Sequence, residues 1–578
     1  MTPQISSAIN RIGWILNRVT GRARRISCAG SGLHETDRAS RQSRRPRHAV
    51  FLLLVSGAAL AASVGLVSVT GQEADQPVDF THNVRDAPAP VAGAVFGSGT
   101  PFKPGDRICS TPTQTTANVD TGCEKAGPSN ETSIAVNPTN EDNIIGGAND
   151  YQLGLNPGGH VTETVYSRAH VTFDRGRTWS EYPILFTSAY QATGDPAVAF
   201  DAAGRAYYAT LGFRFVGPTN ALSPDVLVAN SGDGGKTWES VRVATGSGNF
   251  GSPGDLLDKE YIAAWGQGNA IVTFGDFRLA QKGSFVSARI FSSVTHDGGT
   301  SWSAPQVISG NLDQAFVSVP TVAADGRVYV AFLNTTDLQT GRDDYELVEV
   351  SPSTGARVFG PVKVATTIDG FTDYPIAFGR QTYQNSLFRT WAAGNITADP
   401  ANAAHLAVVW SDMRNSATPA PSDPYTAVTN SDIIVSQSFD RGRTWSAPVA
   451  LMARGDQFMP WGAYDHAGFL RIGTFDRQYD AANRRYGYSL ATEKAHGSLA
   501  FTASQLTTAL SDPTTGDRWF AATVKPAFPF ATTFLGDYSN IAAVPSGGVV
   551  AYWTDMRQNA CFGSRCGHGE DGFFAAAP

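Results

Sequence analysis

The sequence predicts an all-β protein, a β-propeller of four-stranded blades, with seven blades favoured and six as the alternative. Three observations predict it: a strand-like motif occurs seven times, a tight-turn motif occurs four times, and no long stretch with helical spacing of apolar residues follows residue 70. The composition agrees, because 59 Gly, 32 Pro and 11% aromatic residues suit short strands joined by tight turns.

The strand-like motif consists of two apolar strands joined by a turn. Its copies begin at Glu131, Gly194, Asp258, Pro320, Gly394, Pro460 and Gly536, at intervals of roughly 60–80 residues. Each unit has room for four strands, except the last, which has room for about three before Pro578. We therefore expect a segment before residue 129 to supply the missing outer strand and close the ring.

The tight-turn motif has the form S/T-x-D-x-G-x-T/S-W. It occurs at Thr172–Trp179, Ser231–Trp238, Thr295–Trp302 and Ser438–Trp445. Its Asp can accept N–H bonds inside the turn, its Gly can be left-handed, and its Trp can pack between sheets. We interpret the aspartates as structural; they are Asp174, Asp233, Asp297 and Asp440. The last interval is about twice the others, so we expect a decayed copy within residues 351–364.

With these four turns, the chain from residue 129 to its end resembles the sialidase-like Asp-box (BNR) repeat superfamily of β-propellers. The resemblance implies an active site on the face opposite the Asp boxes, where strand 1 of each blade begins and strand 2 ends. It also implies a tyrosine nucleophile, an acid/base aspartate and arginines that hold a substrate carboxylate.

Polar residues are concentrated at these strand ends. The segment GDYSNIAAVPSGGVVAYW is similar to the family's Tyr-Ser segment, which makes Tyr538 the candidate nucleophile. Asp150, at the end of strand 2 of the first unit, is a candidate acid/base. The carboxylate that activates Tyr538 is expected to be Glu260, Asp195 or Glu131. The candidate carboxylate clamp consists of Arg278, Arg414 and Arg557, since guanidinium binds carboxylate bidentately. Further candidate substrate-binding residues are Asp195, Asp537, Asp276, Asp412 and Asp555.

Three of these candidates form D-x-R pairs, Asp276/Arg278, Asp412/Arg414 and Asp555/Arg557. Residues two apart in a strand point the same way, so the pairs can also serve as ion pairs between blades. The first blade departs from the family, because Asn130–Ile134 carries Glu131 where sialidases have an Arg-Ile-Pro motif. Another anionic sugar or a furanose is therefore an expected substrate.

These patterns predict an exported sialidase-like glycoside hydrolase that acts on a cell-surface or extracellular glycan. Two alternatives stay open: a non-catalytic propeller that binds a glycan or protein, and a polysaccharide lyase using Tyr538 with His160 or His170. We expect no metal, no cofactor and a monomer. Nucleic acid is not an expected partner, because the chain has 51 acidic and 44 basic residues. The leader itself is basic, so the rest of the chain is more acidic than these totals indicate.

The N-terminal part predicts export. Residues 1–48 form an Arg-rich leader that we expect to be disordered, and residues 49–72 are an uncharged apolar stretch that suits a signal peptide or membrane anchor. Residues 73–128 are expected to be a linker and ring-closing segment before the propeller at 129–578. In an exported chain, the close pairs Cys109/Cys123 and Cys561/Cys566 predict two local disulfides.

Overall fold

The computed structural model describes residues 107–515 and 535–578, except for 124–125, 156–160, 185–189, 215–221, 249–252, 281–284, 338–341, 369–375, most of 378–391, 416–428, 452–453 and 563–564. The chain separates into residues 1–48 and 49–578, and all described residues belong to the second part. The predicted leader and apolar stretch lie outside the described residues. Where the structure is described, it contains no helix of the length and apolarity needed to cross a membrane.

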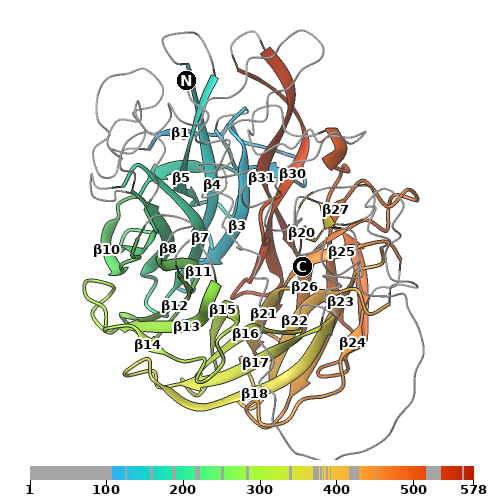
Figure 1. The fold of residues 1–578 in the computed structure, drawn as a ribbon. Helices are drawn as coiled ribbons and strands as arrows, with labels where there is room; N and C mark the ends of the chain where they lie inside the picture. Colours follow the sequence, from blue (N-terminus) through green and yellow to red (C-terminus); the bar gives the residue numbers. More distant parts are fainter. Residues whose placement is uncertain are drawn as a thin grey trace, which may run out of the picture. The chain divides into compact units, whose positions relative to one another are not determined.

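Seven antiparallel sheets form the propeller blades; six have four strands, and the sheet of blade 1 has a fifth strand at its outer edge (Figure 1). Blade 1 has β3 (Ser129–Val136), β4 (Ile144–Leu155), β5 (Val161–Thr172) and β6 (Ser180–Pro183), with β1 (Cys109–Ser110) added outside β6. Blade 2 has β7 (Ala192–Phe200), β8 (Ala206–Phe213), β9 (Asp225–Ser231) and β10 (Glu239–Ala244). Blade 3 has β11 (Gly254–Trp265), β12 (Asn269–Leu279), β13 (Phe285–Thr295) and β14 (Gln306–Val307).

The remaining blades follow in chain order. Blade 4 has β15 (Ala315–Val322), β16 (Val328–Asp337), β17 (Arg342–Val350) and β18 (Arg357–Ile368). Blade 5 has β21 (Gly394–Ala398), β22 (Leu406–Asp412), β23 (Asp432–Ser438) and β24 (Val449–Ala450). Blade 6 has β25 (Gln457–Tyr464), β26 (Leu470–Asp476), β27 (Gly487–Glu493) and β28 (Phe501–Gln505). A hairpin of β19 (Ile376–Ala377) and β20 (Arg380–Gln381) precedes blade 5, and a 3-10 turn, Pro513–Thr515, follows blade 6.

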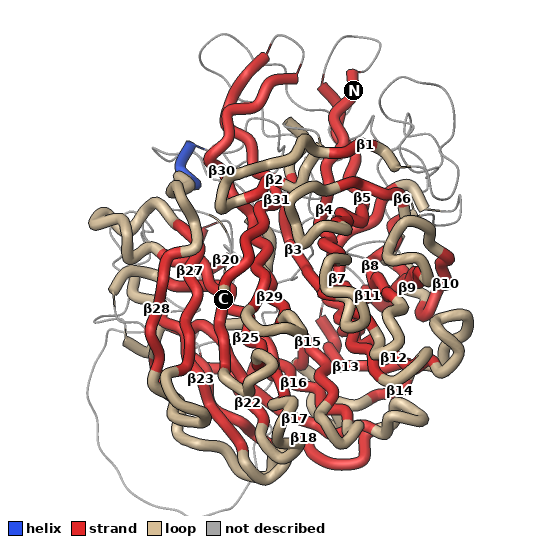
Figure 2. Tube along the Cα trace, turned by 180° about the vertical axis from the view of Figure 1, so that it is seen from behind, coloured by secondary structure: helices blue, strands red, loops and turns tan. Residues whose placement is uncertain are grey.

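Blade 7 joins the two ends of the described chain. It contains β29 (Asn540–Ala543), β30 (Val549–Phe562) and β31 (Arg565–Ala577), and its outermost strand is β2 (Val119–Asp120), which pairs with β31. The first strands of successive blades contact one another around the molecule, and β29 of blade 7 contacts β3 of blade 1 (Figure 2). The seven-bladed fold and its closure by an N-terminal strand are therefore as predicted.

The four tight turns connect strand 3 to strand 4 in blades 1, 2, 3 and 5. In the first, the Asp174 carboxylate accepts the Thr178 N–H at 2.9 Å, Gly176 has φ 85°, and the Trp179 indole N–H donates to the Gly176 carbonyl at 3.1 Å. Hydrogen bonds from the Ser301 side chain and N–H lower the pKa of Asp297 to about 2. The structural interpretation of the turn aspartates is thereby supported. In blade 4 the same connection is made by residues 351–356, inside the segment predicted to hold the decayed copy.

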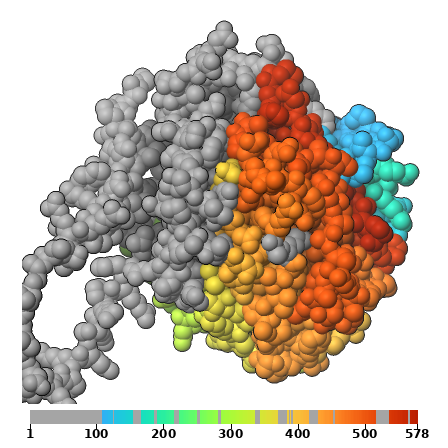
Figure 3. All heavy atoms as spheres, turned by 90° about the vertical axis from the view of Figure 1, so that its right-hand side faces the viewer, coloured from blue at the N-terminus to red at the C-terminus, as the bar shows by residue number. Residues whose placement is uncertain are grey.

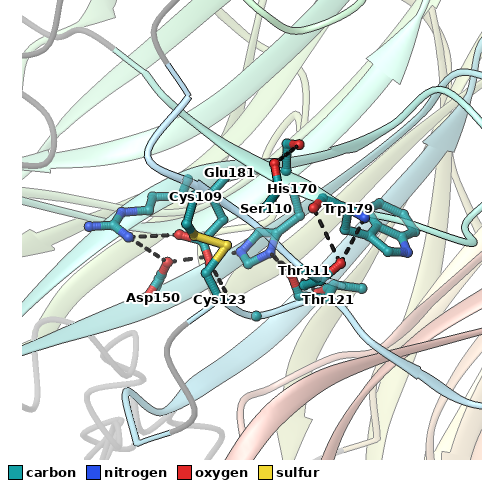
Figure 4. Close-up of a disulfide and its surroundings, with 12 residues drawn as sticks. Cys109, Ser110, Thr111, Thr121, Cys123, Asp150, His170, Trp179 and Glu181 are labelled. Carbon is teal, nitrogen blue, oxygen red and sulfur yellow. Dashed lines mark hydrogen bonds and ion pairs between the residues drawn. A yellow bond between two sulfur atoms is a disulfide. The ribbon is translucent and has the colours of Figure 1, made fainter. Parts of the chain in front are cut away.

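Two disulfides link the predicted cysteine pairs, Cys109–Cys123 and Cys561–Cys566. The first disulfide lies beside the strand that closes the ring. Cys123 comes shortly after the end of β2 in blade 7, and Cys109 begins β1 of blade 1 (Figure 4). The second links the ends of β30 and β31, where the two cysteines face each other in register. Both bonds therefore hold segments at the junction of blades 7 and 1.

Removal of the Cys109–Cys123 disulfide is expected to lower the free energy of unfolding more than removal of the Cys561–Cys566 disulfide. The chain-entropy model assigns about 3 kcal/mol to the loop closed by Cys109 and Cys123 and about 2 kcal/mol to the shorter loop of Cys561 and Cys566. Urea unfolding of the double Ser variants of each pair measures both values. Equal losses, or a greater loss for the Cys561/Cys566 pair, would contradict the loop-length argument.

Candidate functional site

The inner strands of five blades share one backbone feature, a bulge with a left-handed residue. The residues are Glu131 (φ 52°), Asp195 (60°), Lys259 (56°), Val317 (52°) and Met459 (49°). In each strand the register shifts at this point, so the bulges occupy equivalent positions in blades 1, 2, 3, 4 and 6. They interrupt strand 1 near its beginning, on the side we call the mouth face; the turns at the opposite ends define the box face.

Three charged bulge residues, together with Asp537 of blade 7, form a buried ion cluster. The Lys259 ammonium donates to Asp537 at 2.5 Å and to Asp195 at 2.9 Å, and lies 3.5 Å from Glu131. All four side chains are at most 2% exposed. One lysine thus links the inner strands of blades 7, 1, 2 and 3.

Burial raises the pKa of Glu131 well above its usual value, and the charge of Asp195 raises it further. The Asn149 side-chain amide donates to Glu131 at 2.9 Å. Burial, with the charge of Asp195, also raises the pKa of Glu260, whose two carboxylate oxygens have no hydrogen-bond partner among the described residues. The site therefore holds more carboxyl groups than its one lysine can neutralise, which favours the protonated forms of Glu131 and Glu260.

A small cavity lies beside this cluster in the centre of the ring. Inner-strand residues of blades 3 to 7 line it; they are Lys259, Tyr261, Val317, Ala393, Gly394, Met459, Pro460, Trp461, Asp537 and Tyr538. The Tyr261 ring packs on Trp461 at 5.6 Å and on Tyr538 at 5.4 Å. The space open to the centre of a water molecule is about 10 Å³, about what one water needs. The cavity is charged on one side, aromatic on the other, and too small for a sugar ring.

Tyr538 is placed on this cavity but not as an activated nucleophile. Its hydroxyl donates to the backbone carbonyl of Pro196 at 2.9 Å, and its side chain is buried. Burial raises its pKa well above the usual value, and the nearby charges of Glu131 and Asp195 add to the effect. A nucleophilic tyrosine needs the opposite shift, so this geometry favours a packing role.

Tyr538→Phe is expected to lower the free energy of unfolding by about 1–3 kcal/mol, because it removes one buried hydrogen bond and leaves the Pro196 carbonyl unpaired. Ligand binding and any turnover should stay within about twofold of the wild type. Urea unfolding and ligand assays of the same preparation measure both effects. A variant of unchanged stability that loses all turnover would restore the tyrosine mechanism.

The three candidate clamp arginines lie outside this cavity. Arg414 and Arg557 belong to two copies of a W-x-D-x-R pattern. One copy lies at the end of β22, and the other lies within β30, which does not end there as predicted but continues to Phe562. In each copy, the central Asp accepts hydrogen bonds from the Trp indole two residues before it and from the Arg two residues after it: 2.9 and 2.5 Å at Asp412, 3.0 and 2.6 Å at Asp555. The ion pairs therefore lie within one blade rather than between blades.

The third D-x-R copy is different because Phe274 replaces the Trp. Arg278 pairs with Asp255 at 3.3 Å, and one oxygen of Asp276 has no hydrogen-bond partner among the described residues. Burial, together with the charge of Asp255, raises the pKa of Asp276 to about 6. Asp276 is thus a half-buried carboxyl group that can exchange a proton near neutral pH.

Asp150 does not end its strand as predicted, because β4 continues to Leu155. It is buried beside Arg168 (3.5 Å) and His170 (3.9 Å), and Glu181 binds Arg168 at 2.7 Å (Figure 4). Burial lowers the pKa of His170, and His160 lies outside the described residues. This fully buried cluster offers neither Asp150 nor His170 to a substrate.

A groove of about 330 Å³ lies at the mouth end of the seam between blades 4 and 5. Its lining consists of Ala365, Thr366, Ile368, Arg414 and Pro448. The Arg414 guanidinium lies over the Trp410 ring at 5.6 Å and donates to the Thr366 carbonyl of blade 4 at 3.1 Å. Its Nη1 has no hydrogen-bond partner among the described residues, whereas Nη1 of Arg557 donates to Thr508 at 2.7 Å.

No protein-family model and no curated protein matches the chain. Solved structures that match include a protein of unknown function from Dyadobacter fermentans (TM-score 0.39, 11% identity, 81% of this chain and 100% of that one). Others are a polysaccharide lyase described as an ulvan lyase (0.40, 11%, 65% and 80%) and a NanB sialidase variant from Streptococcus pneumoniae (0.37, 10%, 82% and 99%). These likenesses are distant, and the fold class, a seven-bladed β-propeller, rests on this chain's own strand pairing.

Proposed function

We propose that this protein is an exported propeller that binds an acidic extracellular glycan at the groove between blades 4 and 5. The observation that supports this is the state of Arg414: Asp412 and Trp410 hold its guanidinium in one orientation, while Nη1 keeps N–H donors for a ligand. A guanidinium fixed in advance loses little conformational entropy on binding a carboxylate or sulfate. The groove volume of about 330 Å³ is within the range of small-ligand sites, and the Asp-box resemblance names a glycan as the ligand class.

The test is calorimetric titration with oligosaccharides that carry uronate, sialate or sulfate groups. Arg414→Ala should weaken binding roughly 10- to 100-fold, since a charge-assisted hydrogen bond contributes about 1.5–3 kcal/mol. Arg443→Ala is the matched control, because Arg443 also lies over an aromatic ring, Phe359 at 5.5 Å, but on the box face. Equal effects of the two substitutions, or no binding of any acidic oligosaccharide, would contradict the proposal.

Hydrolysis is the second candidate function, and Asp276 favours it. A carboxyl group with a pKa of about 6 beside Asp255 resembles the acid of a two-carboxylate glycosidase site. If the wild type releases the aryl group from a panel of aryl glycosides, Asp276→Asn should abolish that release and leave the unfolding midpoint nearly unchanged. Turnover retained in this variant would remove Asp276 from the reaction.

A further inference from the structure

Blades 5 and 6 meet on the box face at three potential metal ligands. Asp399 and His405 belong to the turn between β21 and β22 of blade 5, and His496 belongs to the turn between β27 and β28 of blade 6. The turn of blade 6 occupies the place where blades 1, 2, 3 and 5 carry an Asp box. Figure 3 shows the side of the molecule on which segments of blades 5 to 7 lie next to one another.

One oxygen of Asp399 faces both imidazoles. Asp399 Oδ2 lies 2.9 Å from His405 Nδ1 and 2.7 Å from His496 Nε2, while Oδ1 accepts the Ala401 N–H at 2.8 Å. The three ligand atoms lie within 4.8 Å of one another. Asp399 and His405 are fully buried, whereas the His496 side chain is 44% exposed, so solvent reaches the group from the blade 6 side.

The second nitrogen of His405 also has hydrogen-bonding partners. His405 Nε2 lies 3.2 Å from the side-chain oxygen of Gln437 and 3.0 Å from the Tyr464 hydroxyl. In the tautomer whose Nε2–H donates to the Gln437 oxygen, Nδ1 presents its lone pair to the side of Asp399. Metal-binding histidines characteristically donate their other N–H in this way.

Neighbouring residues pack closely around the three side chains. The Phe439 ring, 56% exposed, stacks on His405 at 4.3 Å with an interplanar angle of 10°. Gly468 approaches from blade 6, and a Cβ there would lie 2.9 Å from His496 Nε2 and 3.3 Å from Asp399 Oδ1. Only a glycine keeps this approach clear.

We propose that Asp399, His405 and His496 form a binding site for a divalent transition-metal ion of the zinc class that joins blades 5 and 6. Two imidazoles and one carboxylate oxygen suit zinc, which takes three protein ligands and leaves a fourth position for water. The open position is on the His496 side. The site is independent of the groove proposed for glycan binding, because it lies on the opposite face.

The experiment titrates ZnCl₂ into protein that has been stripped with a chelator and dialysed. The wild type should bind about one equivalent and unfold at a higher temperature with zinc, and Co²⁺ in its place should give the visible absorption of a four-coordinate site. His496→Gln should weaken zinc binding by about 100-fold or more, because loss of even a supporting residue costs up to that factor.

His466→Gln is the matched control, since His466 is an exposed histidine on the same face of blade 6; its titration should equal that of the wild type. A wild type that binds no zinc would overturn the proposal, and so would zinc binding that His496→Gln leaves unchanged. His405→Asn provides a second variant. If it folds with wild-type stability without zinc, it should lose the thermal shift, and retention of the shift would also overturn the proposal.

Discussion

Lys259→Met is expected to lower the free energy of unfolding by about 3–5 kcal/mol, because it leaves three buried carboxyl groups without their counterion. The lysine contacts Asp195, Asp537 and Glu131 at the centre of the ring. Urea unfolding measures the loss. Lys236→Met is the matched control, since Lys236 is exposed over the Phe173 ring at 4.4 Å, and its loss should stay within about 1 kcal/mol.

The pH dependence tests the cause of this loss. Burial raises the pKa of Glu131 in the folded state already with Lys259 present, and removal of the ammonium raises it further. A folded-state pKa above the unfolded value makes stability highest below the unfolded value and lowers it as pH rises. The difference between Lys259→Met and the wild type should therefore grow from pH 4 to pH 8. A difference that is constant over this range would mean lost packing, not lost charge compensation.

Gly176→Ala is expected to lower the free energy of unfolding by about 2–5 kcal/mol. Gly176 has φ 85°, where a side chain adds about 1–2 kcal/mol of strain, and its new Cβ would lie 2.2 Å from the Phe574 ring of blade 7. Overpacking of this kind adds about 1–3 kcal/mol. Chemical unfolding followed by tryptophan fluorescence suits the measurement, because Trp179 packs on Phe574 at 5.1 Å.

Gly326→Ala separates the two contributions to this cost. Gly326 has a similar φ of 80°, but no atom lies within 4 Å of its added Cβ, so only the strain of about 1–2 kcal/mol applies. In a double-mutant cycle, Phe574→Ala should relieve part of the Gly176→Ala cost. If Gly176→Ala and Gly326→Ala lower the free energy of unfolding equally, the added Cβ at residue 176 makes no unfavourable contact with Phe574 of blade 7.

The repeat pattern was sufficient to predict the blades, because each copy of the strand motif specifies two paired strands by local alternation. The bulges could not be predicted in this way. Glu131, Lys259 and Val317 share a left-handed conformation at equivalent positions but no chemical property, and the register shift depends on the neighbouring strand. The local pattern therefore assigns no role to Lys259, Tyr261 or Trp461, although the segment DKEY from Asp258 shows three adjacent charges at an inner-strand start.

For the D-x-R pairs, the residue two positions before the Asp distinguishes the two copies with a fixed ion pair from the third copy. Trp410 and Trp553 each supply an indole N–H that fixes the following Asp, whereas Phe274 cannot, and Asp276 stays half-buried with a raised pKa. The orientation of the Tyr538 hydroxyl had no such signal, since its partner, the Pro196 carbonyl, comes from blade 2 across the ring. Contacts between blades depend on ring closure, which no local pattern encodes.

The order of strands in blade 7 affects how the protein is made. β31 lies between β2 and β30, so β2 has no partner until Arg565–Ala577 has been synthesised. A growing chain is therefore an open arc with unpaired strand edges until β31 has been synthesised, and such edges promote aggregation. A chain that lacks Arg565–Ala577 cannot pair β2 and close the ring, so its strand edges stay exposed to pairing with other chains.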